Sequence, residues 1–228
     1  MTTRLAVALD ADSEAGFWKQ LSCFQGLSVV IKVGLSSLGW FKATDLQKLK
    51  DLGFGVFVDA KLHDIPTQVA RAVRFWSDCG ADYLTIHLSG GSSMIRAAVE
   101  SHRNLQLLGV SVLTSLSDSD LKDWSLGDGR RQSLVPHWVK KASSDGLSGF
   151  VCSALELKHF DRDFVQQNCF CTPGLSWGTE SRAKDQKATA SWREALDSGS
   201  RLLVMGRSLL ESEDPRGRTV EVLGAMQS

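Results

Sequence analysis

The sequence predicts an α/β protein, a (β/α)8 TIM barrel that forms one domain over residues 1–228. Short runs of apolar and β-branched residues alternate along the chain with amphipathic stretches, which is typical of βα units. The runs are almost continuously apolar, as expected for parallel strands between covering helices and a packed barrel interior. Eight such units in 228 residues suit a single-domain barrel. An open doubly wound sheet is the alternative.

Each expected strand is an apolar run that ends at a polar or glycine-containing junction. In chain order the runs are residues 5–10, 29–34, 55–60, 83–87, 107–113, 149–153, 169–173 and 202–206. Apolar residues at helical spacing predict helices between them, at residues 39–52, 67–79, 92–102, 133–144 and 192–198. The crossovers are long enough to bring each following strand back parallel.

Two segments, residues 115–132 and 175–190, have no regular pattern, and both follow expected strands. In a barrel they would be loops at the carboxyl ends of the strands, where enzymes of this architecture place their active sites. Long loops at that face are more often functional than idle. We therefore expect a functional site there.

Composition restricts the possible partners and location. Lys and Arg total 26 and Asp and Glu total 26, so no overall field attracts nucleic acid or a membrane, and self-association is not opposed. No apolar run is long enough to cross a bilayer, and Met1-Thr2-Thr3-Arg4 does not begin a signal peptide. We expect a cytoplasmic protein, with its five cysteines reduced and serving mostly as small apolar residues.

Charged residues stand near the ends of three successive strands, where a barrel core should be apolar. Asp10 ends the first strand, Lys32 lies in the second, and Asp59 and Lys61 close the third. Burying them unpaired would be costly, so we expect them to pair at one mouth of the barrel. Asp64 follows on the turn into a helix that begins at Pro66, from which it could reach a neighbouring group or subunit. A rim of salt bridges that only closes the barrel is the alternative.

The spacing of the charges indicates carbanion chemistry. Asp59 and Lys61 are two residues apart, so on an extended backbone both project to the same side. Alternation of Lys32, Asp59, Lys61 and Asp64 would keep both lysines protonated. A protonated lysine can protonate a carbon that loses its substituent, while a fixed carboxylate repels an anionic leaving group. Decarboxylation fits this description.

The segment Asp59-Ala60-Lys61-Leu62-His63-Asp64-Ile65-Pro66 resembles the D-x-K-x-x-D-I-P signature of the orotidine 5′-phosphate decarboxylase family, in its bacterial form. Other similar segments follow the family's order. They are Val7-Ala8-Leu9-Asp10, Ile31-Lys32-Val33-Gly34, Ile86-His87-Leu88-Ser89-Gly90-Gly91, Val112-Leu113-Thr114-Ser115, Val151-Cys152-Ser153-Ala154, Thr172-Pro173-Gly174, Asp185-Gln186 and Val204-Met205-Gly206-Arg207. The resemblance therefore covers nearly the whole chain.

The resemblance implies decarboxylation of orotidine 5′-monophosphate to uridine 5′-monophosphate and CO2, the last step of de novo UMP biosynthesis, with no metal and no organic cofactor. Lys61 would protonate C6 of the pyrimidine, and Asp59 would face the departing carboxylate. Lys32 would orient Asp59 and touch the ribose. Asp64 would cross the interface of a homodimer and complete the partner's site.

The resemblance also implies a set of substrate contacts. Asp10 would bind ribose hydroxyls or position the base, and Thr114 and Ser115 would lie beside the pyrimidine. Gly206 and Arg207 follow the eighth strand, the usual phosphate position in such barrels, and Gln186 should assist them. The remaining expected contacts are Ile65, Thr67, Gln68 and Pro173.

Two positions depart from the family pattern. Ser176 stands where the family has a phosphate-binding arginine, and Arg182 or Lys184 in the same loop could supply the charge instead. Gln68 stands where the family has a threonine at the subunit contact.

Two other functions stay open at this stage. A magnesium-dependent relative such as 3-keto-L-gulonate 6-phosphate decarboxylase carries a similar motif, but the ammonium of Lys32 would compete with the cation. A phosphate-binding barrel that kept Arg207 without turnover is the non-enzymatic alternative. His63 and His87 are expected to be structural, and Trp177 is the one tryptophan expected near the phosphate loop.

Overall fold

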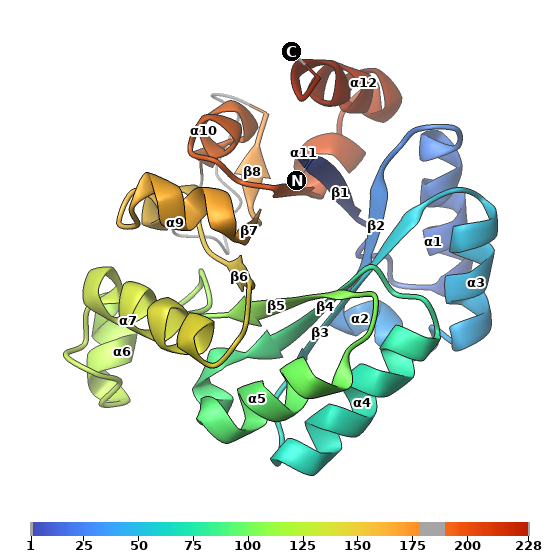
Figure 1. Ribbon diagram of the computed structural model, residues 1–228. Helices are drawn as coiled ribbons and strands as arrows, with labels where there is room; N and C mark the ends of the chain where they lie inside the picture. The colour runs from blue at the N-terminus through green and yellow to red at the C-terminus, as the bar shows by residue number, and fades with distance from the viewer. Residues whose placement is uncertain (1, 178–189, 228) are drawn as a thin grey trace.

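Eight parallel strands form a closed barrel in the computed structural model, which describes residues 2–177 and 190–227 (Figure 1). The strands are β1 (Arg4–Ala8), β2 (Val30–Val33), β3 (Gly55–Leu62), β4 (Tyr83–His87), β5 (Gln106–Val110), β6 (Gly149–Val151), β7 (Cys169–Thr172) and β10 (Leu202–Met205). Their order around the barrel is β1-β10-β7-β6-β5-β4-β3-β2. The predicted (β/α)8 barrel is confirmed, and the doubly wound alternative is wrong.

Helices surround the barrel, as Figure 1 shows. They are α1 (Glu14–Leu21), α2 (Leu35–Leu38), α3 (Ala43–Asp51), α4 (Pro66–Asp78), α5 (Gly91–Ser101), α6 (Asp118–Asp123), α7 (Arg131–Ser144), α8 (Ala154–Leu157), α9 (Arg162–Gln167), α10 (Trp192–Asp197), α11 (Arg207–Leu210) and α12 (Pro215–Ala225). Short 3-10 turns lie at Ser22–Phe24 and Leu88–Gly90. Within the described residues, no helix is long and apolar enough to cross a membrane.

The apolar core has two parts, one on each side of the strands. The larger part lies between strands and helices and includes Phe17, Phe150 and Trp192. The smaller part fills the barrel interior with Ala6, Ala8, Val30, Phe57, Leu108, Cys169, Cys171, Leu202 and Val204. Alternate residues of a strand point to opposite faces, which explains how Cys169 and Cys171 share the interior. Burial raises the pKa of the Cys169 thiol to about 11, so this thiol is protonated and behaves as an apolar residue.

The strand ends differ from the prediction where the chain turns over the rim of the barrel. The first strand ends at Ala8 and the fifth at Val110, so Asp10 and residues 111–113 belong to loops. The irregular segment 115–132 contains α6, which Ser117 and Asp120 cap reciprocally. In segment 175–190, β8 (Leu175–Ser176) pairs in parallel with β9 (Ala190–Ser191). These elements are too short to show the periodicity from which helices and strands are predicted.

Candidate active site

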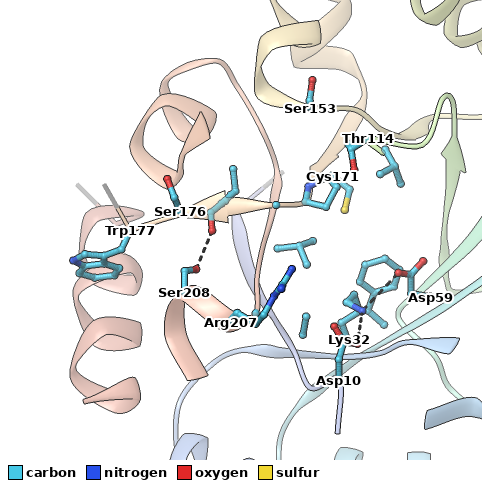
Figure 2. Close-up of a pocket in the computed structure, with 18 of the residues that line it drawn as sticks. Asp10, Lys32, Asp59, Thr114, Ser153, Cys171, Ser176, Trp177, Arg207 and Ser208 are labelled. Atoms are coloured by element: carbon cyan, nitrogen blue, oxygen red, sulfur yellow. Dashed lines mark hydrogen bonds and ion pairs between the residues drawn. The ribbon is translucent and has the colours of Figure 1, made fainter. Parts of the chain in front are cut away.

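A cavity of about 1200 Å³ opens at the carboxyl ends of the barrel strands. Its wall comes from the barrel strands and the loops that follow them, as Figure 2 shows in close-up. Of the residues predicted for the site, those that line this cavity are Asp10, Lys32, Asp59, Lys61, Thr114, Pro173, Gly206 and Arg207. The cavity therefore lies at the face where the sequence predicts the site.

A chain of alternating charges crosses the base of the cavity. The Lys61 Nζ lies 2.8 Å from Asp59 Oδ2, and the Lys32 Nζ lies 3.7 Å from the same oxygen. Lys32 also donates to Asp10 Oδ1 at 3.2 Å. The side chains of Lys32 and Asp59 are 10% and 13% exposed, whereas that of Asp10 is 59% exposed. The array thus runs from a solvent-exposed carboxylate at Asp10 to a largely buried carboxylate at Asp59.

Asp59 is held ionised by its neighbours. Burial alone would raise the pKa of this carboxyl, but the ammonium groups of Lys32 and Lys61 and the hydrogen bonds from Lys61 and Thr85 outweigh it, so its pKa is lowered. The Thr85 hydroxyl donates to Asp59 Oδ1 at 2.9 Å. The same hydroxyl accepts from the backbone N–H of Lys61 at 2.8 Å. Thr85 therefore fixes both members of the central ion pair.

Sequence reasoning did not select Thr85, which is 1% exposed in the middle of β4. A threonine inside an apolar strand is an ordinary strand residue, so it gives no distinct signal.

Lys61 meets Asp59 through an irregular backbone and not through simple strand alternation. Its φ is +47°, in the left-handed region that non-glycine residues rarely adopt. The pairing of β3 with β4 shifts register between Val58 and Leu62, so the strand is distorted around Lys61. Such conformations persist where surrounding contacts fix them, and they cluster at functional sites. The predicted contact is correct, but its predicted geometry is wrong.

His63 and His87 lie next to each other outside the cavity wall, with ring centroids 5.6 Å apart. Burial lowers the pKa of His87, and the nearby His63 and Lys61 lower it further. His87 is therefore neutral near pH 7. The structural role expected for both histidines agrees with this placement.

The opposite end of the cavity is lined by Gly206, Arg207 and Ser208. Figure 2 shows the Arg207 side chain extending into the cavity, while the Ser208 hydroxyl donates to the carbonyl oxygen of Leu175 at 2.9 Å. A Cβ atom on Gly206 would meet Ala8 Cβ at 3.3 Å, so a larger residue fits poorly there. Ser176 donates to the carbonyl oxygen of Ala190 at 3.3 Å, within the β8–β9 pair.

Arg218 of α12 lines the same cavity, and sequence reasoning missed it. Its guanidinium stacks on Trp177 at 4.9 Å from the ring centroid and donates to the carbonyl oxygen of Ser208 at 3.0 Å. Trp177 also packs against Trp192, with ring centroids 5.9 Å apart. Arg218 comes from the second helix after the last strand, so no strand-end motif points to it.

Other predicted residues do not line the cavity of the single chain. Asp64 is exposed, and its Oδ1 accepts from the backbone N–H of Ile65 at 2.6 Å. Ile65, Thr67, Gln68 and Ser115 are also exposed and absent from the cavity wall. Gln186, Arg182 and Lys184 lie outside the described residues.

The carboxylates at the base of the cavity, which could otherwise bind a cation, form ion pairs with lysine side chains. Across residues 2–177 and 190–227, no three His, Cys, Asp or Glu side chains gather in a group that could hold a metal ion. The carboxylates of Asp10 and Asp59 both face the ammonium of Lys32, at 3.2 and 3.7 Å. A divalent cation that used both carboxylates would have to displace that ammonium.

Comparison with known proteins adds independent evidence. Residues 3–221 match the model of the family described as Orotidine 5′-phosphate decarboxylase / HUMPS. A protein of Idiomarina loihiensis named orotidine 5′-phosphate decarboxylase is 32% identical over 96% of both chains. A protein of the same name from Ehrlichia chaffeensis is 34% identical over 85% of this chain and 84% of its own. The crystal structure of orotidine 5′-phosphate decarboxylase from Lactobacillus acidophilus superposes with a TM-score of 0.87 at 28% identity, covering 99% of this chain and all of the other.

Proposed function

The chain belongs to the orotidine 5′-phosphate decarboxylase / HUMPS family, and we propose that it is the carboxy-lyase that converts orotidine 5′-monophosphate to uridine 5′-monophosphate in pyrimidine biosynthesis. The observation that carries this proposal is the Lys32–Asp59–Lys61 array at the base of the cavity. It places a fixed anion and a proton donor side by side on one wall. The relatives' names give the substrate and the reaction.

Asp59 and Lys61 divide the chemical step between them. The Asp59 carboxylate, ionised because its pKa is lowered, would face the carboxylate of the substrate and repel it. The bond from C6 to that carboxylate breaks, CO2 leaves, and the electron pair stays on C6. The Lys61 ammonium, 2.8 Å from Asp59, donates its proton to C6 and gives the product. Solvent then returns a proton to the lysine.

The remaining lining residues would hold the substrate around this centre. Lys32 bridges Asp59 and Asp10, so it can orient the carboxylate and reach the ribose from one position. Thr114, on the loop after β5, would contact the pyrimidine, and Pro173 would close the wall beside it.

The phosphate group is assigned to the end of the cavity that holds Arg207. A guanidinium binds phosphate through two parallel charge-assisted hydrogen bonds, and Gly206 in the cavity wall has no side chain to stand between a phosphate and the backbone. Arg218 adds a second guanidinium to the same cavity, and it would supply the positive charge of the arginine that Ser176 replaces. Gln186 stays a predicted contact outside the described residues.

We also propose a homodimer in which Asp64 completes the partner's site. Asp64, Thr67 and Gln68 are exposed where the chain passes from β3 into α4, and Ile65 among them is 61% exposed. The family resemblance implies that this segment lies at the dimer interface, and a second subunit there would bury the exposed Ile65 side chain. A two-fold interface would bury the same patch on both copies.

Subunit complementation tests the shared site. Lys61→Ala and Asp64→Asn dimers, each inactive, are mixed and allowed to exchange subunits. Random exchange puts both substitutions in one site of each hybrid and leaves the other site intact, so the mixture should recover roughly a quarter of wild-type activity. A mixture that stays inactive after demonstrated exchange would contradict a shared site.

The substrate is tested by direct comparison. Purified protein is assayed for CO2 release from orotidine 5′-monophosphate and from 3-keto-L-gulonate 6-phosphate. We expect turnover of the nucleotide alone. Turnover of the sugar phosphate would favour the magnesium-dependent function, and tight binding of the nucleotide without turnover would favour the non-enzymatic one. The proposal includes a cytoplasmic location, in keeping with the five free cysteines.

A further inference from the structure

Arg131, the first residue of α7, uses every N–H group of its guanidinium. Nη1 donates to the carbonyl oxygens of Leu113 and Leu116 at 2.8 and 3.1 Å, and Nη2 donates to that of Val112 at 3.2 Å. The remaining two donors go to Glu156 Oε1, from Nε at 3.1 Å and from Nη2 at 2.6 Å. These five hydrogen bonds, which end on four oxygen atoms, use the full donor capacity of an arginine side chain.

The second oxygen of Glu156 extends this contact to another loop. Oε2 accepts from the backbone N–H of Ser153 at 2.8 Å, directly after β6. The side chains of Arg131 and Glu156 are only 17% and 9% exposed, so water competes little for these bonds. One ion pair therefore ties the loop after β5 to the loop after β6.

Both tied loops line the cavity, whereas the ion pair itself does not. Val112, Leu113 and Thr114 come from the first loop, and Cys152 and Ser153 come from the second. Figure 2 shows Thr114 and Ser153 on the side of the cavity away from Ser208 and Trp177. Arg131 can thus affect a ligand only through the shape of this wall.

We propose that Arg131 is a positioning residue, which holds the wall carrying Thr114 in place for the pyrimidine ring of the substrate. This inference rests on the proposed function. The carbonyl oxygens of residues 112, 113 and 116 lie in the irregular segment between β5 and α6, outside the hydrogen-bonded ladder of the barrel strands. Without the guanidinium, the loop would have to be ordered by the ligand, and binding would be weakened by that entropy cost.

The ion pair adds no net charge behind this wall. Arg131 and Glu156 neutralise each other at 2.6 Å, so the wall gains rigidity without a change in its charge. A buried ion pair is a poor source of stability compared with apolar residues of the same size. Its contribution here is the fixed geometry of several carbonyl groups at once, which a planar five-donor group provides.

The test separates the base end from the phosphate end of the ligand. Inhibition constants are measured for uridine 5′-monophosphate and for ribose 5-phosphate, with wild type and Arg131→Ala, at a temperature where circular dichroism shows both to be folded. We expect Arg131→Ala to raise the inhibition constant of uridine 5′-monophosphate roughly ten-fold, which is equivalent to the loss of about one hydrogen bond. The inhibition constant of ribose 5-phosphate should stay unchanged. Arg96→Ala is the matched control, because it removes an outer ion pair to Asp145 of the same 2.6 Å length. It should change neither constant.

A purely structural role for Arg131 predicts a different pattern. Equal weakening of both ligands, or no change in either, would overturn the inference. If the alanine variant does not fold, Arg131→Lys replaces it, since a lysine can pair with Glu156 but cannot hold three carbonyls. Wild-type binding of the nucleotide by the lysine variant would equally overturn it. Failure of wild type to bind the nucleotide or to decarboxylate its substrate would instead contradict the proposed function.

Discussion

Thr85 supports the Asp59–Lys61 ion pair through one hydroxyl, and replacing it with valine removes both bonds while keeping the side-chain shape. The hydroxyl donates to Asp59 at 2.9 Å and accepts from the Lys61 backbone at 2.8 Å. A hydrogen bond to a charged group contributes about 1.5–3 kcal/mol, and an unsatisfied buried N–H costs about 1–3 kcal/mol. Lys61 is partly exposed and its N–H can recruit water, so we expect Thr85→Val to lower the free energy of unfolding by about 2–4 kcal/mol.

The same substitution should also affect catalysis in the fraction of the protein that is folded. Lys61 has a left-handed backbone, with φ +47°, that the bond to Thr85 helps to fix. A displacement of the reacting group by about 1 Å can cost about a hundred-fold in rate. We therefore expect kcat, followed by the loss of orotate absorbance, to fall by about that factor in folded Thr85→Val. Thr85→Ser keeps the hydroxyl and should keep kcat. Wild-type kcat in the valine variant would refute the role assigned to Thr85.

Three further predictions concern charge. Arg207→Ala should raise KM roughly 10- to 100-fold through loss of charge-assisted phosphate bonds; an equal effect of the surface variant Arg193→Ala in the same steady-state assay would contradict this. Lys32→Ala removes a cation that lowers the pKa of Asp59, so this pKa should rise and the acid limb of the pH–rate profile should move to higher pH. An acid limb that does not move would contradict the effect of Lys32 on the Asp59 carboxyl. Burial, and after it the charges of His63 and Lys61, lower the pKa of His87 below 6.5 in the folded protein. As the pH falls, His87 therefore takes up a proton at a higher pH in the unfolded chain than in the folded protein. The free energy of unfolding, measured by urea denaturation, should therefore decrease below about pH 6.5, and less so in His87→Gln; identical slopes in both proteins would exclude this.

Patterns in the sequence were sufficient to predict the barrel and the clustering of charged residues at its mouth. The expected strands overlap all eight barrel strands because apolar runs of parallel strands are local features. Lys32, Asp59 and Lys61 could be grouped because strand ends in a barrel converge on one mouth.

Contacts that depend on the folded backbone could not be predicted. Thr85 and Arg131 act through bonds to residues 24–26 and 15–25 positions away, and neither residue type is unusual at its place in the sequence. The left-handed backbone conformation at Lys61 could not be predicted, because it occurs at a lysine and not at a glycine, the residue that usually adopts it. Arg218 enters the cavity from α12, beyond the strands that guided the prediction. Asp64 is exposed and does not line the cavity of its own chain, so the role proposed for it depends on a second subunit.

Decarboxylation of orotidine 5′-monophosphate by wild type and Lys61→Ala, each with EDTA, tests the central claim most directly. We predict that wild type keeps its full rate in EDTA, because the proton donor is a side chain. Lys61→Ala should lose at least about 10²–10⁴-fold in kcat, the contribution of a positioned general acid. Activity that disappears in EDTA and returns with magnesium, or an alanine variant that turns over at the wild-type rate, would contradict the assignment of Lys61 and Asp59.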